Sequence, residues 1–323
     1  MRATQAKDYA ARHLRGIWAA ALMPFRPGDL AMDEAGFRSN LAHWFGELGI
    51  DGVFVSGKQG EFFSMSLAER KRSFEIAVEV AREFGARTIM SASDQNMDTV
   101  IELARHAEGV GADFVVVHAP VLHFVQDRDE VLYAYYRRIA ESVSIGICMW
   151  SHPDSGYLMS PQLCARIAEI PNIVGIKYSV PRPMYAELTE MTRGRLIVST
   201  ASEEEWLDNI LELGWQVYLC SSPPYLLQTA LDRRMRQYTD LAFAGRAEEA
   251  RAVWRSLEPV RAALKSTRPG AKPHAHQKYW QSLLGQVGGA VRPPMLELTE
   301  AERAATRAAF AACGLKLPQE VAA

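Results

Sequence analysis

The chain has 323 residues, of which 48% are hydrophobic and 23% are charged, and its formal net charge is −2. This is an ordinary globular composition with ample material for a large core, and its charge gives no sign of nucleic-acid binding. No apolar run approaches the ~18 residues of a membrane-spanning helix, and the basic start of the chain lacks a signal peptide's apolar stretch. The cysteines are scattered without a pairing pattern, so we expect free thiols and a cytoplasmic protein: Cys148, Cys164, Cys220 and Cys313.

Apolar runs of strand length recur eight times along the chain, and a helical pattern follows each of them. Most runs are continuous rather than alternating, as expected for strands of a parallel sheet that is covered on both faces. Eight such units predict a (β/α)8 TIM barrel, which needs about 250 residues. The predicted strands lie near Gly16–Pro24, Asp51–Ser56, Thr88–Ala92, Asp113–His118, Ser144–Trp150, Ile173–Tyr178, Leu196–Thr200 and Gln216–Ser221.

The helical patterns are clearest in Leu67–Phe84 and Thr99–Val110, where apolar residues recur at positions i, i+3 and i+4. Ser66 and Glu69 form a capping-box pattern at the start of the first. We expect residues 1–241 to form the barrel with a short N-terminal extension, and residues 242–323 to form a C-terminal helical extension. The extension should contain helices at Phe243–Ala263, His276–Leu284 and Thr299–Ala312, with a loop over 266–273.

Several other site types have no support in the sequence. No GxGxxG follows the first strand, and there is no P-loop and no HExxH motif. His274 and His276 could form a pair of metal ligands, but a solvated loop is the favoured interpretation. We therefore expect neither a metal nor an organic cofactor.

Lys177 ends the apolar run that begins at Ile173, so it should lie at the carboxyl end of the sixth strand. In a (β/α)8 barrel that end is the active-site face. A partly desolvated lysine there is able to lose its proton and attack a ketone, forming a Schiff base. Taken alone, such a lysine is more often a surface residue that ends an ordinary strand.

Two further segments follow predicted strands. Gly57-Lys58-Gln59-Gly60-Glu61 comes after the second strand, and its glycines allow a tight turn whose N–H groups would suit an anion. Trp150-Ser151-His152-Pro153-Asp154-Ser155-Gly156 follows the fifth. Cys220 and Ser221 end the eighth strand and should line the barrel mouth.

At these residues the chain resembles the dihydrodipicolinate synthase and N-acetylneuraminate lyase family of class I Schiff-base lyases, over about residues 16–298. The family's G-x-x-G-E loop is matched by Gly57 to Glu61, its V-G-I-K-[DEY]-S segment by Val174 to Ser179, and its late R-x-P segment by Arg292-Pro293-Pro294. The resemblance implies a (β/α)8 barrel with C-terminal helices, usually a homotetramer. It also implies that a 2-oxo acid forms an imine with Lys177.

The chain departs from the family pattern at the residues that move protons and hold the substrate carboxylate. The family's strand-five tyrosine is replaced by Trp150, whose indole N–H donates but is no acid or base near neutral pH. The hydroxyl pair of the glycine loop is replaced by Lys58 and Gln59. His152 follows Trp150 by two residues and is our first choice for the missing acid–base group, with His123 a weaker one. We expect the substrate to contact Gly57, Lys58, Gln59, Gly60, Trp150 and Ser221.

These features favour a lyase that forms a Schiff base with a 2-oxo acid. The absent tyrosine mildly favours dehydration of a 2-oxo-3-deoxy (sugar) acid, because aldol cleavage needs a base on the C4 hydroxyl. A pyruvate-dependent aldolase or hydratase-aldolase of the same family is the alternative. A second alternative is a non-catalytic 2-oxo acid binding protein, which kept its lysine and lost its proton relay. The expected partners are a small-molecule 2-oxo acid and further copies of the chain, without nucleic acid or membrane.

Overall fold

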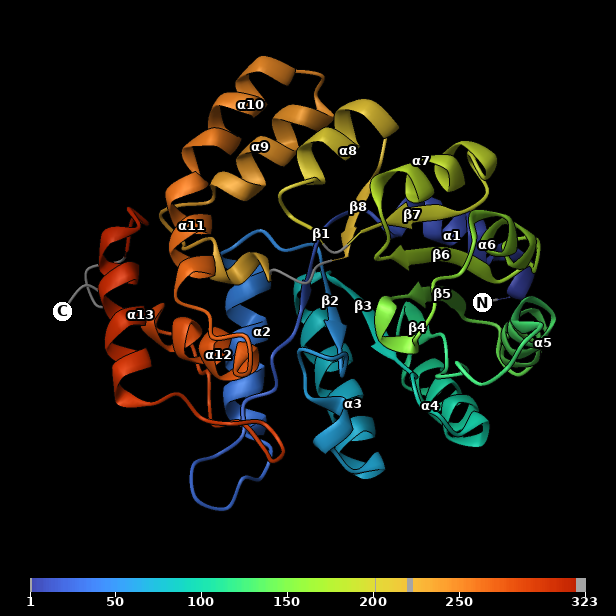
Figure 1. Ribbon diagram of the computed structural model, residues 1–323, viewed down its shortest axis with the longest axis horizontal. Helices are drawn as coiled ribbons and strands as arrows, with labels where there is room; N and C mark the ends of the chain where they lie inside the picture. The colour runs from blue at the N-terminus through green and yellow to red at the C-terminus, as the bar shows by residue number, and fades with distance from the viewer. Residues whose placement is uncertain (1, 201, 220–222, 318–323) are drawn as a thin grey trace. The chain divides into compact units, whose positions relative to one another are not determined.

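The computed structural model describes residues 2–200, 202–219 and 223–317 (Figure 1). Along them, eight strands alternate with helices, and the first seven strands follow one another in the sheet as they do in the chain, with the eighth beside the first. This is the topology of a (β/α)8 TIM barrel, and the predicted fold class is confirmed. None of the helices in the described ranges is both long and apolar enough to cross a membrane.

The chain divides into two compact units, and the first combines Met1–Gly16 with Arg87–Cys220. Its strands β3 to β7 pair in parallel, and Ser199 joins β7 to β8 by donating to the Val217 carbonyl at 2.9 Å and accepting from the Leu219 amide at 2.9 Å. Its strands are β3 (Arg87–Ser91), β4 (Phe114–His118), β5 (Gly146–Ser151), β6 (Ile173–Tyr178), β7 (Ile197–Ser199) and β8 (Val217–Leu219). Its helices are α1 (Ala6–His13), α4 (Met97–Val110), α5 (Arg128–Ala140), α6 (Pro161–Ile167), α7 (Arg182–Met191) and α8 (Trp206–Leu213).

The second unit combines Ile17–Ala86 with Ser221–Ala323. Its strands β1 (Gly16–Ala20) and β2 (Gly52–Val55) pair in parallel. Helix α2 (Glu34–Gly46) packs on α3 (Leu67–Phe84), and both α11 (Glu258–Ser266) and α12 (Pro273–Leu283) pack on α13 (Glu300–Ala312). Helices α9 (Arg234–Phe243) and α10 (Ala247–Ser256) lie side by side (Figure 1). The predicted boundary between residues 241 and 242 falls inside this unit.

Local sequence signals account for most element ends. Ser66 and Glu69 form the predicted capping box, with each side chain accepting a hydrogen bond from the other residue's backbone N–H. Gly85 ends α3 and Gly111 ends α4, and both are left-handed, which glycine adopts without strain. The observed β6 has the predicted bounds, whereas the first predicted strand, Gly16–Pro24, stops at Ala20.

Two expectations for the C-terminal part are wrong. The single helix expected at Phe243–Ala263 is divided, because α9 ends at Phe243, the left-handed Gly245 precedes α10, and Leu257 separates α10 from α11. The loop expected to hold His274 and His276 is helical from Pro273 onward, as proline suits the first turn of a helix. His276 is fully buried there, so it is not a loop residue in solvent.

Candidate active site

Lys177 lies on β6, one residue before the strand ends, and only 1% of its surface is exposed. Every residue of β6 is buried, so the strand carries its lysine into the protein interior. The Nζ atom lies 4.7 Å from the centre of the Trp150 ring. The negative face of an aromatic ring attracts a cation by its quadrupole, so the indole stabilises a positive charge at this position.

Strand register places Lys177 in a row with three other side chains. His118 on β4 is the register partner of Trp150, Trp150 is the partner of Lys177, and Lys177 is the partner of Ser199 on β7. Aligned residues of neighbouring parallel strands point to the same face of the sheet. The row His118–Trp150–Lys177–Ser199 therefore presents its side chains on one face, near the carboxyl ends of the strands.

Trp150 forms the centre of this row and is 2% exposed. Its ring meets the His118 ring edge-on, with the ring centroids 4.7 Å apart and the planes at 82°. The indole thus separates a histidine on one neighbouring strand from a lysine on the other. It provides a rigid apolar surface and no acid or base.

His152, the predicted acid–base residue, lies just beyond β5 with its side chain 30% exposed. Its Nδ1 accepts a hydrogen bond from the Asp154 amide at 3.2 Å, which caps the short helix η3 (Pro153–Ser155). The same Nδ1 lies 2.9 Å from Asp154 Oδ1, so a protonated ring would bond that carboxylate instead. The His152 ring is 6.4 Å from each of the rings of Trp150 and His118, centroid to centroid.

The glycine loop belongs to the second unit and follows β2. A Cβ at Gly57 would come within 2.8 Å of the Phe54 ring, and one at Gly60 within 3.1 Å of the Ala21 carbonyl. Both positions therefore need glycine for close packing rather than for a left-handed backbone. Lys58 and Gln59, between them, are half-buried, and the Lys58 carbonyl accepts from His274 Nε2 at 2.8 Å.

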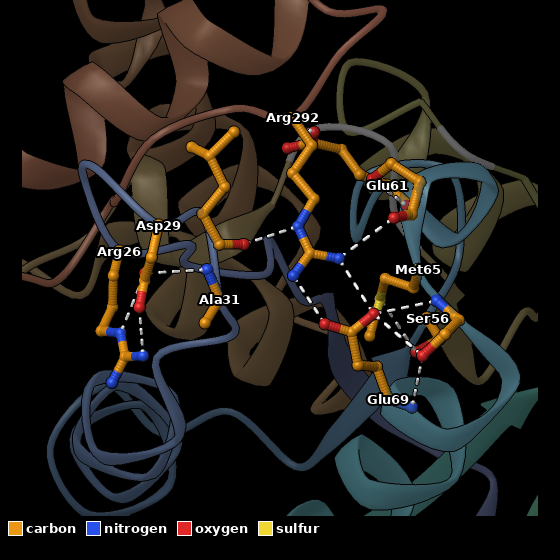
Figure 2. Close-up of polar contacts among 11 residues, drawn as sticks. Arg26, Asp29, Ala31, Ser56, Glu61, Met65, Glu69 and Arg292 are labelled. Carbon is orange, nitrogen blue, oxygen red and sulfur yellow. Dashed lines mark hydrogen bonds and ion pairs between the residues drawn. The ribbon is translucent and has the colours of Figure 1, made fainter.

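Glu61 ends the glycine loop in a left-handed conformation and is fully buried. Its carboxylate accepts from the Arg292 amide at 3.0 Å and pairs with Lys278 Nζ at 2.5 Å. Figure 2 shows the Arg292 guanidinium directed at Glu69, which it bonds at 2.6 and 3.0 Å. Arg292, in the late Arg-Pro-Pro segment, thus binds both Glu61 at the end of the glycine loop and Glu69 in the first turn of α3.

This ion-pair network shifts two pKa values. Burial lowers the pKa of Lys278 to about 8, against the opposing effect of Glu61. The hydrogen bonds from Arg292 lower the pKa of Glu69 to about 2. The Lys278 and Arg292 side chains also donate three hydrogen bonds to backbone carbonyls and two to Glu69, so the network is a positioning scaffold for the loop.

The predicted site residues that the structure describes therefore form two groups, one in each unit. Lys177, Trp150 and His152 lie together in the first unit, and Gly57, Lys58, Gln59 and Gly60 lie together in the second. Ser221 lies outside the described residues. His118 is the residue that sequence reasoning missed, and its only local signal is its place at the end of the fourth predicted strand. Within the described ranges, no group of three or more histidine, cysteine or acidic side chains is arranged to hold a metal ion.

Known proteins resemble this chain over nearly its whole length. The sequence profile of the Dihydrodipicolinate synthetase family matches residues 13–313. A 4-hydroxy-tetrahydrodipicolinate synthase of Rhodospirillum centenum is 30% identical over 304 residues, covering 93% of this chain and 99% of the relative. A protein named probable 5-dehydro-4-deoxyglucarate dehydratase, of Methylobacterium radiotolerans, is 29% identical over 296 residues, covering 90% of this chain and 92% of the relative.

Solved structures agree with the fold. A monomeric dihydrodipicolinate synthase variant superposes with a TM-score of 0.81 at 24% identity, covering 95% of this chain and 99% of the other. YagE of E. coli K12, solved in complex with pyruvate, superposes with a TM-score of 0.80 at 22% identity, covering 94% of this chain and 99% of the other. Because the family profile spans most of the chain, this protein belongs to the dihydrodipicolinate synthetase family, whose members are lyases.

Proposed function

We propose that this protein is a Schiff-base lyase that dehydrates a 2-oxo-3-deoxy acid bound to Lys177. The observation that carries the proposal is the buried Lys177 amine at the carboxyl end of β6, held 4.7 Å from the centre of the Trp150 ring. A lysine withheld from water suits imine formation, because burial disfavours the ammonium form and the neutral amine is the nucleophile.

The proposed reaction begins with attack of the Lys177 amine on the C2 carbonyl of the acid, and loss of water gives an iminium. The iminium withdraws electrons from C3, so a proton on C3 becomes labile. A hydroxyl on C4 then leaves as water, and hydrolysis of the imine frees the lysine. The relative named a probable 5-dehydro-4-deoxyglucarate dehydratase supports dehydration as the reaction class within this family.

The remaining site residues are assigned by the same proposal. Gln59 and the backbone N–H groups of Gly57 to Gly60 bind the carboxylate of the acid, because a glycine turn offers several donors to an anion. Trp150 is the pocket wall, and His152 is a candidate for proton transfer. Ser221 is proposed as a substrate contact, and the protein is proposed to work as a homotetramer, which light scattering on the purified protein measures.

Borohydride reduction in the presence of pyruvate tests the proposal. A reduced pyruvate adduct on the peptide that contains Lys177, read by mass spectrometry, is the expected result. Turnover of a panel of 2-oxo-3-deoxy acids, followed by the loss of water from the product mass, tests the dehydration step. An adduct without turnover of any acid would identify a 2-oxo acid binding protein instead. The absence of any adduct in the wild-type protein would overturn the proposal.

A further inference from the structure

His118 is a second histidine at the carboxyl ends of the strands, and it lies in the same register row as Trp150 and Lys177. It is half-buried, and its backbone N–H donates to Ser93 Oγ at 2.9 Å. Its ring packs edge-on against the indole that contacts the lysine on the other side. Nothing in the family resemblance assigns a role to this position.

The hydrogen bonds of His118 determine which ring nitrogen is basic. Its Nδ1 lies 2.7 Å from the Ala119 carbonyl oxygen, which only accepts hydrogen bonds, so Nδ1 carries the proton. Ser155 Oγ gives its own proton to the same carbonyl at 2.8 Å and therefore faces Nδ1, 3.3 Å away, as an acceptor. In the neutral ring, Nε2 then holds the lone pair. The hydrogen bonds at Nδ1 thus fix the orientation of the ring and leave Nε2 as its basic nitrogen.

His152 differs from His118 in this respect. The Nδ1 of His152 has two contacts that need opposite protonation states, because the Asp154 amide donates to it at 3.2 Å while the Asp154 carboxylate, 2.9 Å away, only accepts. Protonation of that nitrogen would therefore exchange the cap of η3 for a hydrogen bond to the carboxylate. The Nδ1 of His118 needs no such exchange, because its contacts are the same in the neutral and the protonated ring.

The place of Trp150 indicates which substrate atoms His118 would reach. Trp150 on β5 stands between the two residues in the row, so the backbones of His118 on β4 and Lys177 on β6 are two strand spacings apart, roughly 10 Å. A substrate tethered to Lys177 that lies along the indole would present its carbons beyond C2 to the histidine. The reacting atoms of a dehydration, C3 and C4, are those carbons.

We infer that His118 carries the proton of the elimination, from C3 to the departing C4 hydroxyl. This inference rests on the proposed Schiff-base chemistry of Lys177. Nε2 takes the C3 proton of the iminium while the C3–H electron pair forms the C2–C3 double bond and the nitrogen gains the former imine pair. The nitrogen pair then re-forms the imine, the C2–C3 pair becomes the C3–C4 double bond, and the C4–O bond breaks. The leaving oxygen takes the proton from Nε2 and departs as water, so His118 returns to its neutral form.

Exchange of the methyl protons of pyruvate with D2O isolates the first step, because it requires the imine and a base at C3 but no leaving group. Exchange is followed by proton NMR in the wild-type protein and in the variants His118→Asn, His152→Asn and His13→Asn. Asn keeps a donor where Nδ1 stands and removes the basic nitrogen. His13 is the matched control, because α1 ends there before the first strand begins.

The His118→Asn variant should lose about 10²–10⁴-fold in exchange rate, the usual contribution of a general base. Borohydride trapping of pyruvate on Lys177 should persist in that variant, and His13→Asn should exchange like the wild type. His152→Asn, which tests the rival residue, should lose less of the exchange than His118→Asn does. Added imidazole should restore part of the exchange in His118→Ala, because it can replace the deleted ring.

Three outcomes separate this inference from the proposed function. Wild-type exchange in a His118→Asn variant that still traps pyruvate would overturn the role of His118 and leave the Schiff base standing. A loss of exchange in His152→Asn alone would assign the proton to that residue instead. A wild-type protein that traps no pyruvate would refute the Schiff base itself. Should His118→Asn trap no pyruvate, His118→Gln replaces it, and a loss of trapping in both would also overturn the inference.

Discussion

Lys177 and Trp150 are register partners on adjacent parallel strands, and the lysine nitrogen lies 4.7 Å from the centre of the indole ring. The two residues belong to different motifs of the sequence. Their contact places the indole beside the atom to which a ligand of the lysine would be attached. This arrangement suits the proposed chemistry, because an apolar ring beside a buried amine limits the access of water to it.

Replacement of Lys177 should abolish adduct formation. We expect Lys177→Ala to lose all pyruvate trapping and all exchange of pyruvate protons, because no other nucleophile is proposed at this position. Intact-protein mass after borohydride reduction measures it. Lys316, near the C-terminus, is a suitable control, and Lys316→Ala should label like the wild type. Equal labelling of the Lys177→Ala variant would remove this lysine from the mechanism.

Replacement of Trp150 by Phe should preserve the wall and leave the proton chemistry in place. We expect trapping on Lys177 to continue, with a loss of about 0.5–2 kcal/mol in adduct stability from the weaker cation–π contact. The pyruvate concentration that gives half-maximal trapping measures this loss. A Trp150→Phe variant that forms the adduct but exchanges no pyruvate protons would show that the indole itself takes part in proton transfer.

Replacement of Gln59 by Ala should weaken binding of the oxo-acid carboxylate. Loss of one hydrogen bond to a charged group corresponds to about 1–3 kcal/mol. Half-maximal trapping of pyruvate should therefore move to higher concentration, while the limiting adduct yield is unchanged. Gln237 lies exposed on α9 in the same unit, so Gln237→Ala is the matched control. An unchanged pyruvate dependence in Gln59→Ala would exclude this side chain from the site.

Removal of Lys278 should destabilise the second unit strongly. Its amine is 1% exposed and pairs with the fully buried Glu61 at 2.5 Å, so Lys278→Met leaves a buried carboxylate without its cation. We expect a loss of about 3–5 kcal/mol in the free energy of unfolding, measured by urea denaturation. The double variant Glu61→Gln, Lys278→Met should recover part of it. A single variant as stable as the wild type would show that the pair contributes nothing.

The same lysine should leave a signature in the pH dependence of stability. Its pKa is lowered from 10.5 to about 8 in the folded protein, mainly by burial. Between about pH 8 and about pH 10.5 the unfolded chain therefore binds more protons at this residue than the folded chain does, so its contribution to the free energy of unfolding rises with pH. The free energy of unfolding of the wild type minus that of Lys278→Met, measured by urea denaturation across this range, should increase with pH. A difference that stays flat or falls would contradict the lowered pKa.

Short-range signals in the sequence determined the elements of this protein. The continuous apolar run that ends in Lys177 predicted β6 with its observed bounds, and Ser66 with Glu69 predicted the start of α3. Hydrophobic periodicity, capping residues and turn glycines act within a few residues of one another, so a sequence displays them directly. The family motifs likewise identified the lysine, the glycine loop and the Trp150 segment without any structure.

Only the tertiary structure decided how residues far apart in the chain face one another. The register that aligns His118 with Trp150 and Lys177 depends on strand pairing between segments separated by more than twenty residues. The burial of Glu61 against Lys278 and Arg292 depends on the packing of the C-terminal segment. Such contacts are set by packing of the whole core, for which one sequence carries no local pattern. His118, unremarkable among eight histidines in the sequence, thus became the strongest acid–base candidate once its neighbours were known.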